Sequence, residues 1–181
     1  MKRVSRTDRR PPSGGRAVVH AALRDKHYHA ARLRGANKSG RPLPVYVVAS
    51  MDAKRFVRSA KLVGWDYPVF SGSDLIGLAR LRLRRRKWTF CGLIHGWLID
   101  ELAQVAASVE AAEASTEGIK LALLEVPRLS LTFLWVSTRW SDRFVDLRPP
   151  KQGSDREIES ATALAKRLPL QAPATGPQPH Q

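Results

Sequence analysis

Apolar and basic residues alternate along residues 75–84, and this is the most regular pattern in the chain. Alternation with a period of two is typical of a β-strand, because successive side chains point to opposite faces. One face holds Leu75, Gly77, Ala79, Leu81 and Leu83. The other face ends in the basic residues Arg80, Arg82 and Arg84.

A second apolar stretch at residues 88–94 predicts that this strand is one half of a β-hairpin over residues 75–95. We expect residues 84–87 to form the loop, since a two-residue turn normally requires Gly or Asn. The alternative, a two-residue turn at Arg85-Arg86, gives the same register. Leu81 then faces Phe90 across the pair. A slip of one residue would move the arginines into the core, so the pattern also predicts the register.

Outside the hairpin, periodicity predicts four helices and five more strands. The helices are expected at residues 17–34, 50–62, 97–114 and 155–167, the last with Ser154 as its N-cap. The strands are expected at residues 45–49, 67–70, 119–126, 129–137 and 143–147. Both faces of the strands between residues 119 and 137 are largely apolar, which predicts a central position with cover on both sides.

Consecutive strands in this order can pair as hairpins, so we expect an α+β fold. The predicted sheet is antiparallel, is built from hairpins at residues 75–95 and 119–147, and carries packed helices. A single domain is expected at residues 17–167. It is flanked by a disordered basic N-terminal arm at residues 1–16 and a disordered Pro-rich C-terminal tail at residues 168–181.

The chain of 181 residues has a formal net charge of +15, from 31 Lys and Arg against 16 Asp and Glu. A positive field of this size attracts polyanions, such as nucleic acid or an acidic protein. Arg outnumbers Lys by 22 to 9, however, and a GC-rich bacterial coding sequence produces that excess without selection for binding. The charge therefore indicates a class of partner and leaves the function open.

The candidate nucleic-acid-binding residues gather in two segments and one turn. They are Arg24, Lys26, Arg32 and Arg34 in the first helix, Arg80, Arg82, Arg84, Arg85, Arg86 and Lys87 in the hairpin, and Arg139 and Trp140 in a later turn. Alternate residues of a strand are about 6–7 Å apart, which is comparable to the spacing of phosphates along a nucleic acid. Two other interpretations of the arginine face stay open: solvation of an exposed strand, and pairing with the acidic helix at residues 97–114.

The sequence contains no motif for catalysis, metal binding or cofactor binding, so we expect neither an enzyme nor a metal or cofactor site. Cys91 is the only cysteine, which excludes an intrachain disulfide and a multi-cysteine zinc site. No uncharged apolar stretch reaches about 18 residues, so no transmembrane segment is expected. Without a secretory signal either, the predicted location is the cytoplasm.

These observations favour a small basic protein that contacts the phosphates of DNA or RNA without reading the base sequence. The alternative is a non-enzymatic accessory module of a bacterial system, which binds an acidic protein partner. The oligomeric state stays open in both cases.

Overall fold

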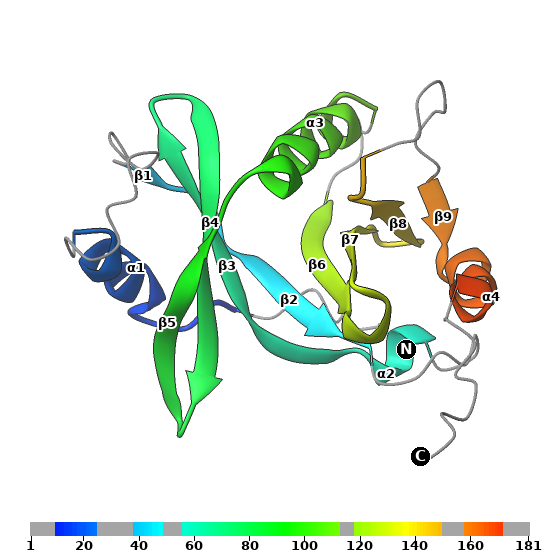
Figure 1. The fold of residues 1–181 in the computed structure, drawn as a ribbon. Helices are drawn as coiled ribbons and strands as arrows, with labels where there is room; N and C mark the ends of the chain where they lie inside the picture. Colours follow the sequence, from blue (N-terminus) through cyan, green and yellow to red (C-terminus); the bar gives the residue numbers. More distant parts are fainter. Residues whose placement is uncertain (1–9, 25–37, 49–55, 113–117, 150–157, 172–181) are drawn as a thin grey trace, which may run out of the picture.

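The chain folds around one mixed β-sheet in a computed structural model, which describes residues 10–24, 38–48, 56–112, 118–149 and 158–171. Nine strands in these ranges pair in the order β5-β4-β3-β2-β6-β7-β8-β9, with β1 also paired to β3 (Figure 1). The strands are β1 (Lys38–Ser39), β2 (Leu43–Val47), β3 (Lys61–Ser71), β4 (Asp74–Arg84), β5 (Lys87–Ile94), β6 (Lys120–Val126), β7 (Leu131–Ser137), β8 (Asp142–Asp146) and β9 (Ile158–Ser160). The helices are α1 (Gly15–Arg24), α2 (Phe56–Ser59), α3 (Trp97–Ala112) and α4 (Ala161–Gln171), and a 3-10 turn, η4 (Pro127–Leu129), joins β6 to β7.

Helices packed on this sheet confirm the α+β class, but the prediction of an antiparallel sheet is wrong at one pair of strands. β2 and β6 run parallel, with Val45 opposite Leu123 and Val47 opposite Glu125. Every other pair among the described strands is antiparallel. A parallel pair needs a long crossover, and the chain makes one through β3, β4, β5 and α3 before β6 begins.

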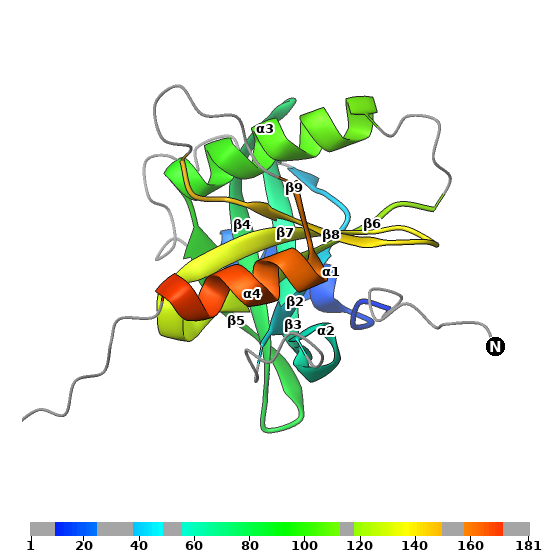
Figure 2. The ribbon, with the colours of Figure 1, turned by 90° about the vertical axis from the view of Figure 1, so that its right-hand side faces the viewer.

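Different helices cover the two faces of the sheet (Figures 1 and 2). α3 covers one face, where its Leu102 packs in one cluster with Leu123 of β6. α2 and α4 cover the opposite face, where Leu164 of α4 joins the cluster of Phe133 and Trp135. Helix α1 packs on the β3–β5 end of that second face. β6 and β7 are therefore central and covered on both sides, as their two apolar faces predict.

The β4–β5 hairpin has the predicted register in its outer half, where Leu81 lies opposite Phe90. The predicted four-residue loop is wrong, because Arg85 and Arg86 alone connect the paired strands. Both have positive φ angles, 47° and 65°, and a two-residue turn of this kind matches the right-handed twist of the strands. A β-bulge at Cys91 shifts the register of the inner half of the hairpin.

Other boundaries differ from the prediction for local reasons. Residues 61–71 form one strand, so the helix predicted as far as residue 62 ends early, at Ser59 of α2. α4 begins at Ala161, where the Ser160 hydroxyl accepts a 3.2 Å hydrogen bond from the N–H of Ala163. The predicted cap, Ser154, lies outside the described residues, as do residues 1–9, 25–37 and 172–181 of the predicted arm, first helix and tail.

Leu81→Ala is expected to lower the free energy of unfolding by about 2–5 kcal/mol, because removing a fully buried side chain leaves a cavity. Leu83→Ala is the matched control, since Leu83 lies on the same face of the same strand. Leu83 is 55% exposed, and its loss should cost about 0.5 kcal/mol. Urea denaturation measures both values, and equal losses would contradict this assignment of faces.

Tyr67 is buried in the cluster that α1 covers. Its hydroxyl oxygen lies so close to Gly15 that a Cβ at that position would come within 2.3 Å of it, so glycine permits the start of α1 to rest on the ring. Burial raises the pKa of Tyr67 above its ordinary value, and the nearby positive charge of Arg16 opposes this effect without cancelling it.

The raised pKa of Tyr67 predicts a loss of stability in alkali. Below about pH 10, the ordinary pKa of tyrosine, folded and unfolded chains both hold the phenolic proton and the contribution is constant. Above that pH the unfolded chain releases the proton more readily, so the free energy of unfolding falls. Tyr67→Phe cannot ionise and should lose less stability between about pH 9 and 11. Urea denaturation across this range tests it, and identical pH profiles would refute it.

Candidate functional site

Two of the arginines predicted to bind phosphate are held by carboxylates of the protein itself. Arg80 Nη2 lies 2.9 Å from Asp66 Oδ2 and 2.5 Å from Glu125 Oε1. Arg82 Nη1 lies 3.1 Å from the other Asp66 oxygen, and its Nη2 lies 3.6 Å from Glu125 Oε1. The Asp66 side chain is fully buried, whereas those of Arg80 and Arg82 are 27% and 17% exposed. This arginine face therefore pairs internally, with Asp66 and Glu125 in place of the predicted acidic helix.

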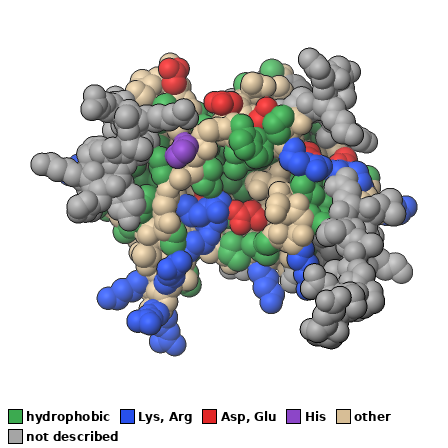
Figure 3. Space-filling model, in the orientation of Figure 1, with side chains coloured by type: hydrophobic (Ala, Val, Ile, Leu, Met, Phe, Trp, Pro, Cys, Tyr) green, Lys and Arg blue, Asp and Glu red, His purple; other side chains and the backbone are tan. Residues whose placement is uncertain are grey.

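Strand pairing brings these four residues together, and we call them the ion-pair cluster. Arg80 lies opposite Asp66 in the β3–β4 pair, so both side chains leave the sheet on the same face. Glu125 reaches the same arginine from β6, on the far side of β2. The cluster thus connects β4 with β6 across two intervening strands. Basic and acidic side chains lie side by side near the middle of this face (Figure 3).

The guanidinium of Arg80 keeps its charge in this setting. Burial lowers the pKa of Arg80, but the hydrogen bonds and negative charges of Asp66 and Glu125 outweigh burial and raise the pKa above its ordinary value. Because arginine does not deprotonate in proteins, the cluster keeps both of its cations.

Neither Asp66 nor Glu125 stands out in the sequence pattern, although both are part of this site. The signal that points to them is a lone acidic residue within an otherwise apolar strand, in the runs GWDYPVF and LALLEV. A carboxylate buried in such a strand needs a cationic or hydrogen-bonding partner, and the arginine face is the available source.

Asp66→Asn is expected to lower the free energy of unfolding by about 3 kcal/mol, because it leaves two partly buried cations with one carboxylate. We place the loss at the low end of the range for broken buried ion pairs, since both arginines keep some contact with water. Asp74→Asn is the matched control: Asp74 is exposed, and its loss should cost about 0.5 kcal/mol or less. Urea denaturation decides, and equal costs would show that the ion-pair cluster does not stabilise the sheet.

The other basic residues of the hairpin are exposed. Arg84, Arg85, Arg86 and Lys87 form the end of the β4–β5 hairpin, and we call them the basic tip. The hairpin projects away from the packed helices (Figure 1), and basic side chains surround its outer end (Figure 3). Among the ion pairs of the described residues, none involves a side chain of the basic tip.

The backbone of the basic tip is strained. Arg85 and Arg86 have φ angles of 47° and 65°, in the left-handed region that favours Gly, Asn and Asp. A residue with a Cβ there costs about 1 kcal/mol or more relative to glycine. Folding alone therefore does not explain two arginines at these positions.

The predicted turn that contains Arg139 and Trp140 lies at the end of the strands opposite the basic tip. Trp140 is 82% exposed, and the Arg139 guanidinium stacks 4.9 Å from the centre of its ring. This turn follows Ser137, which pairs with Lys120 at the start of β6. The basic tip ends β4, which runs in the same direction as β6, so the turn and the tip lie toward opposite ends of the strands.

The predicted site residues therefore do not form one surface. Arg24 is exposed at the end of α1, which packs on the face of the sheet opposite the ion-pair cluster. Lys26, Arg32 and Arg34 lie outside the described residues. The basic tip is the part of the predicted site in which several exposed cations adjoin one another.

The described ranges contain no cluster of metal-ligating side chains. Within them, no three His, Cys, Asp or Glu side chains come together in a way that could hold a metal ion. Cys91 is exposed on β5, with its thiol 3.5 Å from the carbonyl oxygen of Thr89. None of the helices in these ranges combines the length and the apolar composition needed to cross a bilayer.

Comparisons with protein-family models, with curated proteins and with solved structures find no match to this chain.

Proposed function

We propose that the protein binds nucleic acid through its phosphates, and that the basic tip makes the contact. Four adjoining cations on a projecting two-stranded ribbon have the shape and charge for this role. The major groove of duplex DNA admits a two-stranded β-ribbon, and arginines at the end of the ribbon reach phosphates on the flanking backbones. Such contacts give affinity without base recognition.

The backbone strain of the turn is the observation that carries the proposal. Asn-Gly would form the same turn at lower energy, yet Arg85 and Arg86 occupy the two left-handed positions. Strain kept at an exposed turn points to a use outside the fold. Two guanidinium groups at the end of the hairpin favour contact with a polyanion over a role in folding.

The alternation in the sequence suggests that Arg80 and Arg82 bind phosphate, but in this proposal their role is structural. Asp66 and Glu125 already bind both guanidinium groups, so a nucleic acid would have to displace a carboxylate to reach them. We assign them to holding the hairpin against the sheet, and we assign phosphate contact to the basic tip.

Replacing Arg85-Arg86 by Asn-Gly tests this assignment, because it should move stability and binding in opposite directions. The free energy of unfolding is expected to rise by about 1 kcal/mol as strain is relieved. Affinity for a duplex oligonucleotide should fall, and the slope of log affinity against log salt should flatten by about 2, since two phosphate contacts are lost. Urea denaturation and filter binding at several salt concentrations measure the two effects.

Lys38→Gln with Lys166→Gln is the control, because it removes the same charge from two exposed positions outside the hairpin. This variant should keep the salt slope of the unsubstituted protein. An equal loss of binding in both variants would mean that diffuse charge attracts the nucleic acid and would exclude the basic tip as its site. Absence of binding to duplex and single-stranded oligonucleotides at low salt would reject the proposal altogether.

A specific observation favours the second candidate, an acidic protein partner. Trp140 is almost fully exposed and carries the Arg139 guanidinium on its ring, and tryptophan and arginine are the residues most enriched in binding hot spots. Capture of one acidic protein that survives nuclease treatment and is lost in Trp140→Ala would support this candidate over nucleic acid.

A further inference from the structure

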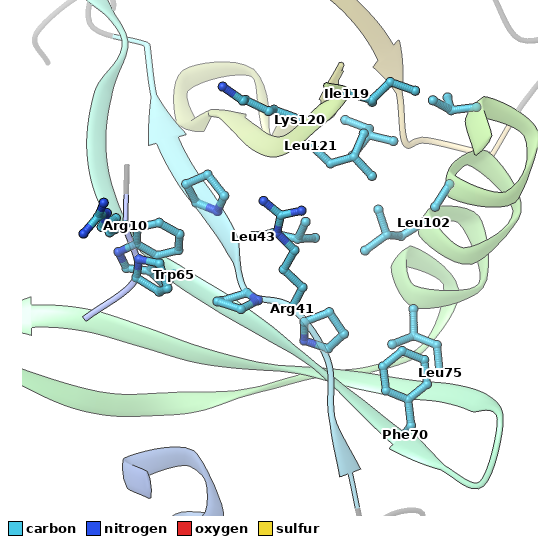
Figure 4. Close-up of a pocket in the computed structure, with 17 residues that line it drawn as sticks. Arg10, Arg41, Leu43, Trp65, Phe70, Leu75, Leu102, Ile119, Lys120 and Leu121 are labelled. Atoms are coloured by element: carbon cyan, nitrogen blue, oxygen red, sulfur yellow. The ribbon is translucent and has the colours of Figure 1, made fainter. Parts of the chain in front are cut away.

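A cavity of about 590 Å³ opens where β2 begins, at the fork between β3 and β6. α3 closes one side through Leu102, and Leu121 of β6 lies across from it (Figure 4). Arg41, in the chain just before β2, extends into the space between β2, β6 and α3, while Arg10 lies beside Trp65 (Figure 4). The volume is in the range of cavities that bind small molecules.

The side chains that line this cavity can donate hydrogen bonds but cannot accept them. The polar groups on its side chains are the cations Arg10, Arg41 and Lys120 and the indole N–H of Trp65, all of which are donors. The other side chains that line it are hydrocarbon, and four are prolines, which lack a backbone N–H: Pro11, Pro42, Pro44 and Pro68. Among the described lining residues, no side chain offers a hydrogen-bond acceptor or a negative charge.

The combination of cationic donors and apolar walls favours one class of ligand. A metal ion or an organic cation would meet only positive charge, and a sugar or a nucleobase would leave its own donors without side-chain acceptors. A hydrocarbon body fits the apolar walls, and an acidic head group supplies acceptors and a negative charge that complement the cationic donors of the lining.

We propose that the cavity binds an amphipathic anion, a hydrocarbon chain with one acidic head group, with Arg41 as a ligand of that group. Arg41 is the cation that Figure 4 places between Leu43, Leu102 and Leu121. An acidic head group bound to its guanidinium would therefore place the attached hydrocarbon chain of the ligand beside these leucines. In the described part of the protein, Arg41 forms no ion pair with a carboxylate that the ligand would have to displace. The site lies at the opposite end of the strands from the basic tip and is independent of nucleic-acid binding.

Isothermal titration calorimetry with dodecanoate, dodecanol and dodecylamine, each below its aggregation concentration, tests the ligand class. Dodecanoate should bind with one site per chain and at least about tenfold more tightly than dodecanol, because only the anion pairs with the cations. Dodecylamine should not bind. A further titration with dodecyl phosphate distinguishes a phosphate-preferring site from a carboxylate-preferring one. Equal affinity for dodecanoate and dodecanol, or no binding of either anion, would overturn the proposal.

Variants then locate the site. Arg41→Gln should weaken dodecanoate binding about tenfold, whereas Arg128→Gln, which removes an exposed arginine outside the cavity, should leave it unchanged. Ala106→Phe places a ring in the cavity from α3 and should abolish binding, and Leu121→Trp fills it from β6 if the first variant does not fold. The Asn-Gly variant of the basic tip should bind dodecanoate normally. Binding that survives a folded cavity-filling variant would refute the proposal.

Discussion

The buried carboxylate of Asp66 is the constraint on which the arrangement of the sheet depends. A charge removed from water is stable only when it is paired and hydrogen-bonded, and Asp66 meets this requirement through Arg80 and Arg82 of the neighbouring strand. Those arginines also bind Glu125 of β6, so one cluster links β3 and β4 to the half of the sheet that begins at β6, across the parallel β2–β6 pair. Since β2 is only five residues long, this bridge over it supplements a short backbone ladder.

The cluster also divides the basic residues of the hairpin into two groups with different physical roles. Arg80 and Arg82 are neutralised by carboxylates and hold β4 to the rest of the sheet. The residues of the basic tip, two positions farther along, have no such partners in the described part of the chain and carry backbone strain. The basic residues of the hairpin look alike in the sequence. They differ in the fold because Asp66 of β3 and Glu125 of β6 pair with Arg80 and Arg82 but not with the basic tip.

Local patterns predict the local features of this fold. Alternation in residues 75–84 predicts which side chains face the core, because a strand has a fixed period of two and Leu81 and Arg82 differ sharply in burial cost. β3 runs through Gly64 and Pro68, two residue types that weaken strands. Pro68 is tolerated because it lies between Asp66, which pairs with β2, and Val69, which pairs with β1, so its missing N–H interrupts neither ladder.

Long-range features leave little trace in the sequence. The parallel pairing of Val45 with Leu123 joins segments separated by three strands and two helices, and no periodicity encodes it. The partners of Arg80 depend on that pairing, so the interpretation of the arginine face stays open until the topology is known. The cavity beside Arg41 has the same origin, because its walls come from β2, β3, β6 and α3.

Arginine side-chain NMR tests most directly the claim that carboxylates hold Arg80 and Arg82, while the arginines of the basic tip are available to a ligand. The Nε–Hε signals of all arginines are recorded during titration with a short duplex at low salt. The signals of Arg85 and Arg86 are expected to shift with the duplex, while those of Arg80 and Arg82 stay in place because Asp66 and Glu125 keep their hydrogen bonds. Shifts at Arg80 and Arg82 as large as those at Arg85 and Arg86 would contradict the account.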